Sequence, residues 1–315
     1  AGAPEREAVA PTPMAKKNHV VVGLGEVHWD LLPAGKQLGG APTNFAYITN
    51  LLGDRGIVAS RVGNDDLGRE ARDTLEKLQL STANLQLDPV HPTGTVKVQV
   101  DAAGQPKFEI SENVAWDFLA WTSEWNALAR EADAVCFGSL AQRSLASRKT
   151  ILEFVKATRP SATRIFDVNL RQAFFSAEVL AESANSADIV KLNDDELPRV
   201  MALLGIQHRD EETSAGDLLR AFGLKLVCVT RGAKGSLLVN EAGSHRHPGY
   251  QIKVADTIGA GDAFTAALVH KYLRGAPLAT MNNAANRVGS WVASQIGGTP
   301  EPSAAQLREI FIANT

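Results

Sequence analysis

The residues best suited to chemistry form a short run near the carboxyl end of the chain, Asp256 to Phe264. Gly259, Ala260 and Gly261 are small, so the backbone there can turn tightly and approach a ligand closely. An apolar helical pattern follows, and the first N–H groups of a helix are unpaired and partly positive. The run therefore predicts an anion-binding turn at a helix start. Asp262 stands within it, where a carboxylate could take a proton from a hydroxyl during phosphoryl transfer.

A simpler interpretation of the same run stays open. Asp262 could be the N-cap of an ordinary helix, because aspartate is common at that position. The preceding segment, Gln251–Val254, is predicted to be the end of a strand.

A second glycine-rich turn lies near the amino end of the chain, at Gly39 and Gly40. The glycines permit backbone contact with a ligand, and Asn44 offers both a donor and an acceptor. Pro42 suits the first turn of the predicted helix, which the pattern places at 46–52, and the next helix is predicted at 69–78. Asp30 lies in the extended segment before the turn, where it could bind sugar hydroxyls or simply cap a turn.

Two familiar nucleotide-binding motifs are excluded by their spacing. After Gly23 and Gly25, the third glycine of a dinucleotide fingerprint would fall at His28. The segment 231–236 contains glycine, lysine and serine, but not at Walker A spacing, and a strand rather than a helix is predicted to follow.

Composition excludes further classes of protein. The net charge is −3 without a basic stripe, which argues against nucleic-acid binding, and no apolar stretch approaches the length of a membrane span. Cys136 and Cys228 each lie in an apolar, strand-like run, which predicts buried free thiols and a cytoplasmic location.

Polar residues follow two predicted strands at their carboxyl ends, where open α/β sheets bind ligands. Asn169 and Arg171 follow the strand that begins at Thr163, and Asn193 and Glu196 follow the strand that begins at Asp188. Each pair has an alternative interpretation. Arg171 could be a surface salt-bridge residue, and Asn193 with Glu196 fits a capping box.

Strands and helices alternate from residue 134 onwards, which predicts a parallel sheet with helices on both faces. Residues 93–100 and 105–110 instead form a hairpin pattern with a turn at 101–104. Residues 1–16 are rich in Ala, Pro and Glu, which predicts a disordered extension or a cloning remnant before one domain at 17–315.

Gly39-Gly40 with Asn44, and Asp256-Thr-Ile-Gly-Ala-Gly-Asp262, resemble the two signatures of the PfkB (ribokinase-like) carbohydrate kinase family. The start Gly25-Glu-x-x-Trp-Asp30 is similar to the fructokinase branch, and the resemblance extends from residue 17 to about 302. It implies a three-layer α/β/α fold with a mostly parallel central sheet. It also implies a small β-sheet lid built from segments about 27–38 and 91–112.

The resemblance implies ATP-dependent transfer of the γ-phosphate to a primary hydroxyl, with D-fructose converted to fructose 6-phosphate. Asp262 would be the general base, supported by the turn Gly259, Ala260 and Gly261. The sugar would be held by Asp30, Gly39, Gly40 and Asn44. The residues expected to bind ATP are Asn169, Arg171, Asn193, Thr230, Gly232, Gly235 and Asn286.

Cations and partners follow from the same resemblance. Mg²⁺ would contact Glu196 through water, because Mg²⁺ keeps water ligands. Asp256 and Ile258, with the loop 296–300, would hold a monovalent cation such as K⁺ where the enzyme uses one. A homodimer formed through the lid is expected.

Two groups of alternatives remain. The acceptor could be 2-keto-3-deoxygluconate, ribose or a nucleoside; an acid sugar would need a cationic partner, for which the lid offers Lys36, Lys97 and Lys107. The chain could also be a non-catalytic sugar or nucleotide sensor on the same fold, although the presence of Asp262 argues against this.

Overall fold

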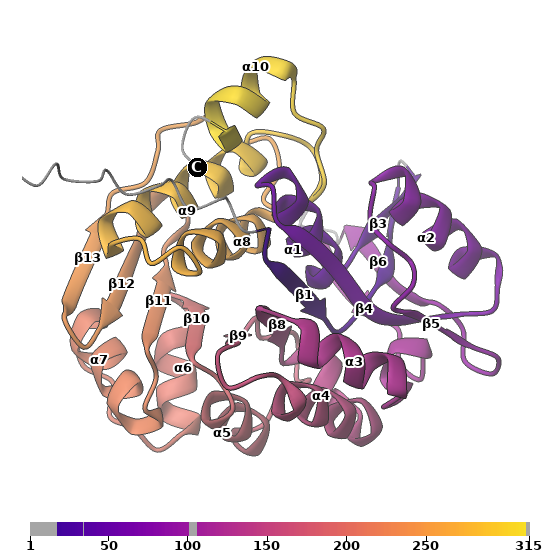
Figure 1. The fold of residues 1–315 in the computed structure, drawn as a ribbon, viewed down its shortest axis with the longest axis horizontal. Helices are drawn as coiled ribbons and strands as arrows, with labels where there is room; N and C mark the ends of the chain where they lie inside the picture. The colour runs from indigo at the N-terminus through magenta and orange to yellow at the C-terminus, as the bar shows by residue number, and fades with distance from the viewer. Residues whose placement is uncertain (1–17, 34, 101–105, 313–315) are drawn as a thin grey trace, which may run out of the picture.

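The computed structural model describes residues 18–33, 35–100 and 106–312. The predicted extension 1–16 and the hairpin turn 101–104 lie outside the described residues. The main element is a nine-stranded sheet that runs across the whole molecule (Figure 1). Its strands, in spatial order, are β13 (Gly243–His247), β12 (Ser236–Asn240), β11 (Leu226–Thr230), β10 (Ile189–Asn193), β9 (Thr163–Asp167), β8 (Ala134–Gly138), β1 (Val20–Leu24), β4 (Arg55–Gly63) and β5 (Leu85–Asp88).

The strands from β5 to β11 are parallel, and β12 and β13 close one edge as an antiparallel hairpin. The parallel strands are continuous apolar runs because helices cover both of their faces. Since parallel strands end at the same edge of a sheet, the carboxyl ends of β1, β8, β9, β10 and β11 gather their following loops in one place.

Two hydrophobic cores form, one on each face of the sheet, because successive side chains of a strand point to opposite faces. Val21 belongs to one core and its neighbour Val22 to the other. Helices α1 (Ala41–Leu51), α2 (Asp66–Lys77), α8 (Ala260–Tyr272) and α9 (Leu278–Ala293) cover the first face. Helices α3 (Ser123–Glu131), α4 (Leu145–Ala157), α5 (Ala177–Asn185), α6 (Glu196–Leu203) and α7 (Glu211–Phe222) cover the second (Figure 1).

A separate four-stranded sheet forms the predicted lid, in the order β3 (Gly35–Gly39), β2 (His28–Leu32), β6 (Gly94–Val100) and β7 (Pro106–Ile110). Strands β2 and β6 are parallel, and the two outer pairs are antiparallel. The indole N–H of Trp29 donates to the carbonyl of Leu67 at 2.9 Å, which ties the lid to α2. The three-layer fold and the lid predicted from the sequence are confirmed.

The structure corrects several predicted boundaries. Helix α1 begins at Ala41, with Pro42 in its first turn, and not at residue 46. Helix α2 begins at Asp66 and not at residue 69, because the Asp65 side chain caps it by accepting from the Gly68 N–H at 2.7 Å.

The strand predicted at Gln251–Val254 is wrong. The segment has no regular structure, and Ile252 and Val254 are exposed. The backbone just after this segment bonds to the end of helix α9 and not to a strand, because the Ala255 N–H donates to the Ala293 carbonyl at 2.9 Å.

Both predicted free thiols, Cys136 and Cys228, are buried and unpaired. Across the ranges that the structure covers, no helix combines the length and the apolar character that crossing a bilayer demands.

Candidate active site

A cavity of about 480 Å³ lies between the carboxyl edge of the main sheet and the lid. It brings together residues that are far apart in the sequence. The predicted site residues that line it are Asp30, Gly39, Gly40, Asn44, Asn169, Arg171, Ile258, Gly259, Gly261 and Asp262. The two glycine-rich turns therefore share one cavity.

The turn at the start of α8 has the geometry of an anion cradle. Gly259 is the residue before the helix, with φ of 74°, a conformation that favours glycine. The Gly261 and Asp262 N–H groups have no hydrogen-bond partner among the described residues. A helix N-terminus with such free amides attracts an anionic group.

Asp262 is not the helix cap, which rules out the simpler interpretation of its run. It lies in the first turn of α8, and no side chain caps that helix. Its Oδ2 accepts a hydrogen bond from Asn44 Nδ2 at 2.8 Å, which links the two glycine-rich turns. Burial raises the pKa of Asp262 to about 6, and the nearby carboxylate of Asp167 adds to the rise.

Close packing requires the glycine pair before α1, because Gly39 lies against the Asp30 side chain and Gly40 against the Glu26 backbone. A Cβ added at Gly39 would lie 2.5 Å from Asp30 Oδ2, and one at Gly40 would lie 2.4 Å from the Glu26 carbonyl oxygen. Asp30 Oδ1 also lies 3.3 Å from His28 Nε2. Gly39 thus lets the chain pass close to the Asp30 carboxylate, and Gly40 lets it pass close to the loop after β1.

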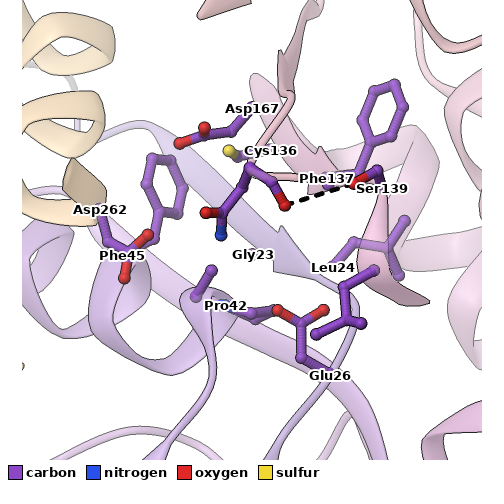
Figure 2. Close-up of a pocket in the computed structure, with 14 residues that line it drawn as sticks. Gly23, Leu24, Glu26, Pro42, Phe45, Cys136, Phe137, Ser139, Asp167 and Asp262 are labelled. Atoms are coloured by element: carbon purple, nitrogen blue, oxygen red, sulfur yellow. Dashed lines mark hydrogen bonds between the residues drawn. The ribbon is translucent and has the colours of Figure 1, made fainter. Parts of the chain in front are cut away.

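Glu26 was not predicted as a site residue, but it lines the cavity from the loop after β1. Figure 2 shows Glu26, Asp167 and Asp262 around a smaller adjoining pocket, with Cys136 in its wall. Burial raises the pKa of Glu26 above its ordinary value. Burial likewise raises the pKa of Cys136, so this thiol is un-ionised at neutral pH.

Asn169 and Arg171 follow β9 into the cavity, as predicted. Asn169 has a φ of 43°, a left-handed conformation that asparagine tolerates better than most residues. Its carbonyl accepts from the Ser139 hydroxyl at 3.4 Å. Arg171 is exposed and forms no ion pair with another described residue, so the salt-bridge alternative is not supported.

Asp167 and Lys191 are a further pair that sequence reasoning did not single out. Lys191 lines the cavity, and its Nζ lies 3.1 Å from both carboxylate oxygens of Asp167. The sequence contained a signal for Lys191, because it is the one charged residue in the apolar strand β10, and buried charges are rarely unpaired.

The two reciprocal hydrogen bonds of the predicted capping box form just before α6, but the residue that precedes the helix is Asp195 and not Asn193. Asn193 Oδ1 accepts from the Glu196 N–H at 2.8 Å, and Glu196 Oε2 accepts from the Asn193 N–H at 2.9 Å. Glu196 Oε1 also accepts from the Leu170 N–H at 2.7 Å. Both carboxylate oxygens of Glu196 are thus engaged by backbone N–H groups.

Most of the other predicted nucleotide residues lie along the same sheet edge but do not line the cavity. Asn193 pairs with Thr230 across β10 and β11, and Gly232 and Gly235 occupy the turn after β11. Asn286 on α9 is buried, and its amide donates to Ser236 Oγ at 2.7 Å and to Asn282. The structure therefore places Asn286 away from the Asp262 cavity.

Asp256 joins the two loops proposed for a monovalent cation. Its Oδ1 accepts from the Ile258 N–H at 3.0 Å, and its Oδ2 accepts from the Gly297 N–H at 3.1 Å. Within the described ranges, no group of three or more His, Cys, Asp or Glu side chains is arranged to hold a metal ion. A divalent ion here would need oxygen ligands from a bound substrate and from water.

The mostly parallel sheet with a small lid sheet over one edge is a ribokinase-like fold. Residues 19–304 match the family described as pfkB family carbohydrate kinase. The chain belongs to this family and is a carbohydrate kinase, that is, a phosphotransferase.

Several relatives are similar over most of their length. Sugar kinase PH1459 of Pyrococcus horikoshii is 31% identical over 281 residues, which are 86% of this chain and 86% of that protein. Its crystal structure matches with a TM-score of 0.81 at 28% identity, over 94% of this chain and 99% of that chain. A fructokinase of Vibrio alginolyticus is 30% identical over 78% of this chain and 81% of that protein. A fructokinase double mutant from Vibrio cholerae, solved with fructose, ADP and potassium, has a TM-score of 0.77 at 28% identity, over 94% of this chain and 100% of that chain.

Proposed function

We propose that the chain is an ATP-dependent kinase that phosphorylates the primary hydroxyl of a neutral sugar, with D-fructose converted to fructose 6-phosphate. The observation that carries the proposal is the Asp262 carboxylate, which is not used as a cap and faces the cavity beside free backbone amides. The names of the fructokinase relatives support fructose as the acceptor.

Asp262 acts as the general base in this proposal. It accepts the proton of the acceptor hydroxyl while that oxygen forms a bond to the γ-phosphorus. The bond from the γ-phosphorus to the bridging oxygen breaks, and ADP leaves with that oxygen. General base catalysis contributes about 10²–10⁴-fold to such a step.

In the turn Gly259–Asp262, the free N–H groups of Gly261 and Asp262 hold the negative charge of the transferring group, whereas the Ala260 N–H already donates to the Thr257 carbonyl at 3.3 Å. Donors fixed in place before reaction stabilise developing charge without the cost of reorganising water. Phosphoryl transfer depends mainly on positioning and on this kind of charge stabilisation. We therefore expect the cradle to matter at least as much as the base.

The acceptor end of the cavity favours a neutral sugar over an acid sugar. Glu26, Asp30 and His28 line this end, together with Gly39, Gly40 and Asn44. Of the lid lysines considered for an acid sugar, Lys36 pairs with Glu70 and lies over the Trp29 ring, and Lys97 does not line the cavity. The side chain of Lys107 lies outside the described residues.

ATP would extend from the cradle along the sheet edge, past Asn169 and Arg171 towards Asn193, Thr230, Gly232 and Gly235. Mg²⁺ accompanies ATP in such enzymes and neutralises phosphate charge. The residues present fit an ion that would be held mainly by phosphate oxygens and water. Glu196 does not line the cavity and binds backbone N–H groups through both oxygens, so it would contact the ion only through water. A monovalent cation would lie between the loop at Asp256 and Ile258 and the loop at Gly297, which the Asp256 carboxylate joins by hydrogen bonds. Asn286 would contribute to an adenine site only indirectly, through the hydrogen bond that its amide donates to Ser236 Oγ.

Release of ADP tests the proposal, with Mg²⁺ present and with and without K⁺. The acceptors are fructose, ribose, 2-keto-3-deoxygluconate, adenosine and fructose 6-phosphate. We expect the strongest signal with fructose, and Asp262→Asn should lose at least about 10²-fold in kcat while ATP still binds.

Each outcome has a distinct meaning. Activity with another acceptor would keep the mechanism and discard fructose. Near-normal turnover of Asp262→Asn would remove Asp262 as the base. Tight ligand binding without ADP release on any acceptor would favour the sensor alternative.

A further inference from the structure

Lys191 and Asp167 face each other across neighbouring strands; Lys191 lines the cavity and Asp167 lines the smaller adjoining pocket. They are direct register partners in the parallel pair β10 and β9. Their side chains are only 10% and 9% exposed, and Lys191 Nζ lies 3.1 Å from each oxygen of Asp167. An ion pair at this depth loses much of its solvation, and an apolar pair of the same volume would often stabilise a sheet equally well. Stability alone is therefore a weak reason for these charges.

The pair is connected to the phosphate cradle. A Cβ built at Gly261 would lie 3.1 Å from Lys191 Nζ, so the ammonium group sits directly behind this part of the cradle. The Thr265 hydroxyl lies 3.0 Å from Asp167 Oδ2 and 2.9 Å from the Gly261 carbonyl oxygen. The ion pair is thus joined to the first turn of α8, which carries Asp262.

We propose that Lys191 is a positioning residue for the transfer reaction: held by Asp167 behind Gly261, it fixes a positive charge behind the cradle and acts on the reaction through Asp262. The inference rests on the proposed function, in which Asp262 is the base. Together with the hydrogen bond from Asn44, the Lys191 charge favours the ionised form of Asp262 in a buried site that already contains Asp167.

The groups that face Asp262 come from several elements. Asp167 on β9 raises the pKa of Asp262, in addition to the larger effect of burial. Lys191 on β10 and Arg171 after β9 lower it, as does the hydrogen bond from Asn44 on α1. Glu26 and Cys136 also border the adjoining pocket. The two members of the ion pair therefore act on Asp262 in opposite directions.

The opposite effects of Lys191 and Asp167 on the pKa of Asp262 distinguish a positioning role of the ion pair from a purely structural one. Loss of a structural ion pair would harm the protein in the same way whichever member is removed. Under the proposal, Lys191→Met raises the pKa of Asp262, because two carboxylates then share the site without a cation. Asp167→Asn lowers it, because the like charge is gone while Lys191 remains.

The decisive measurement is a ¹³C NMR titration of aspartate carboxyl groups in the ligand-free protein, with the Asp262 signal identified by its loss in Asp262→Asn. We expect the midpoint to rise by about one pH unit in Lys191→Met and to fall by about one in Asp167→Asn. The acid limb of kcat against pH should move in the same directions. Arg143→Met is the matched control, because Arg143 and Asp117 form another buried ion pair, at 2.8 Å, and it should leave the midpoint unchanged.

The double variant Lys191→Met/Asp167→Asn removes both charges together, so it leaves no unpaired charge if a single variant fails to fold. Its midpoint should lie between those of the single variants. Shifts in the same direction, or no shift in any variant, would overturn the inference. The NMR titration needs no turnover, so this failure is distinct from the failure of the proposed function, which an active Asp262→Asn would show.

Discussion

The carboxylates of Glu196 and Asp262, both near the carboxyl edge of the main sheet, differ in the hydrogen bonds that their oxygens accept. Glu196 has both oxygens engaged by backbone N–H groups, so it orders the start of α6 and the loop after β9. Asp262 accepts one side-chain hydrogen bond, from Asn44, and keeps a raised pKa. A base must have a free lone pair and a pKa near the working pH, so Asp262 meets both conditions.

Asp30→Ala is predicted to raise KM for the sugar by about 10–100-fold and to leave KM for ATP nearly unchanged. The reason is the loss of a charged hydrogen-bond acceptor, which is worth about 1.5–3 kcal/mol. Steady-state kinetics with each substrate varied in turn would measure both constants. Lys97→Ala is the control on the same lid, because Lys97 is exposed and does not line the cavity. Equal effects on the two substrates would place Asp30 outside the sugar site.

The sequence predicted the cavity residues that lie within contiguous motifs, such as Gly39, Asn44 and Asp262. It could not predict contacts between side chains from different strands. The pairing of Asp167 with Lys191 depends on the register of β9 against β10, and register is set by the whole sheet. Glu26 and His28 were missed because only the fold turns their strand and loop towards the cavity.

At the scale of elements, Asp54 fastens the amino end of the main sheet to α8. It follows α1, and its oxygens accept from the His19 N–H at 3.0 Å, from His270 Nδ1 at 2.7 Å and from Arg274 Nη2 at 2.8 Å. Burial opposes ionisation of Asp54, but these hydrogen bonds outweigh it and lower its pKa below the ordinary value.

Asp54→Asn is predicted to lower the free energy of unfolding by about 3 kcal/mol at pH 7. Breaking a buried ion pair costs about 3–5 kcal/mol, and we expect a value at the lower end because the Arg274 side chain is partly exposed to water. A carboxylate with a lowered folded pKa stabilises the protein above its unfolded pKa of about 4. The difference between wild type and variant should therefore shrink as the pH falls below about 4.

Urea unfolding at pH 7, 5 and 3 would measure this effect. Glu131→Gln is the control, because Glu131 pairs with Arg55 at the surface and its loss should cost less than about 1 kcal/mol. A constant difference between Asp54→Asn and wild type across the three pH values would contradict the proposed ionic origin.

Most helices and strands were predicted correctly in type, but their starts were not. Apolar periodicity identifies the middle of a helix, whereas its start depends on local caps. Asp65 extends α2 towards the amino end by a hydrogen bond that the apolar pattern does not show. The strand predicted at Gln251–Val254 failed because alternating apolar residues do not ensure that a neighbouring strand is available.

At the scale of the whole molecule, β3 and β7 are the two edge strands of the lid sheet, and neither pairs with a further strand among the described residues. Edge strands expose backbone N–H and C=O groups that can pair with another chain. We therefore retain the expectation of a homodimer formed through the lid.

Sedimentation velocity should give twice the chain mass of 33.6 kDa at micromolar concentration. Hydrogen exchange should then slow in β3 or β7 as the protein concentration rises, while β5, at the edge of the main sheet, should not respond. A monomer at all concentrations would contradict the prediction, and a dimer with protection only in β5 would place the interface elsewhere.

The two cysteines share one core face of the main sheet, and their positions have a consequence for the study of its motions. Burial raises the pKa of both thiols, so neither is nucleophilic while its part of the sheet stays closed. A thiol reagent can therefore react only through transient local opening. Labelling of Cys136 would measure local opening of β8, near Asp262, whereas labelling of Cys228 would measure local opening of β11, three strands away. The ratio of their labelling rates would show whether the sheet near Asp262 fluctuates independently of the sheet around β11.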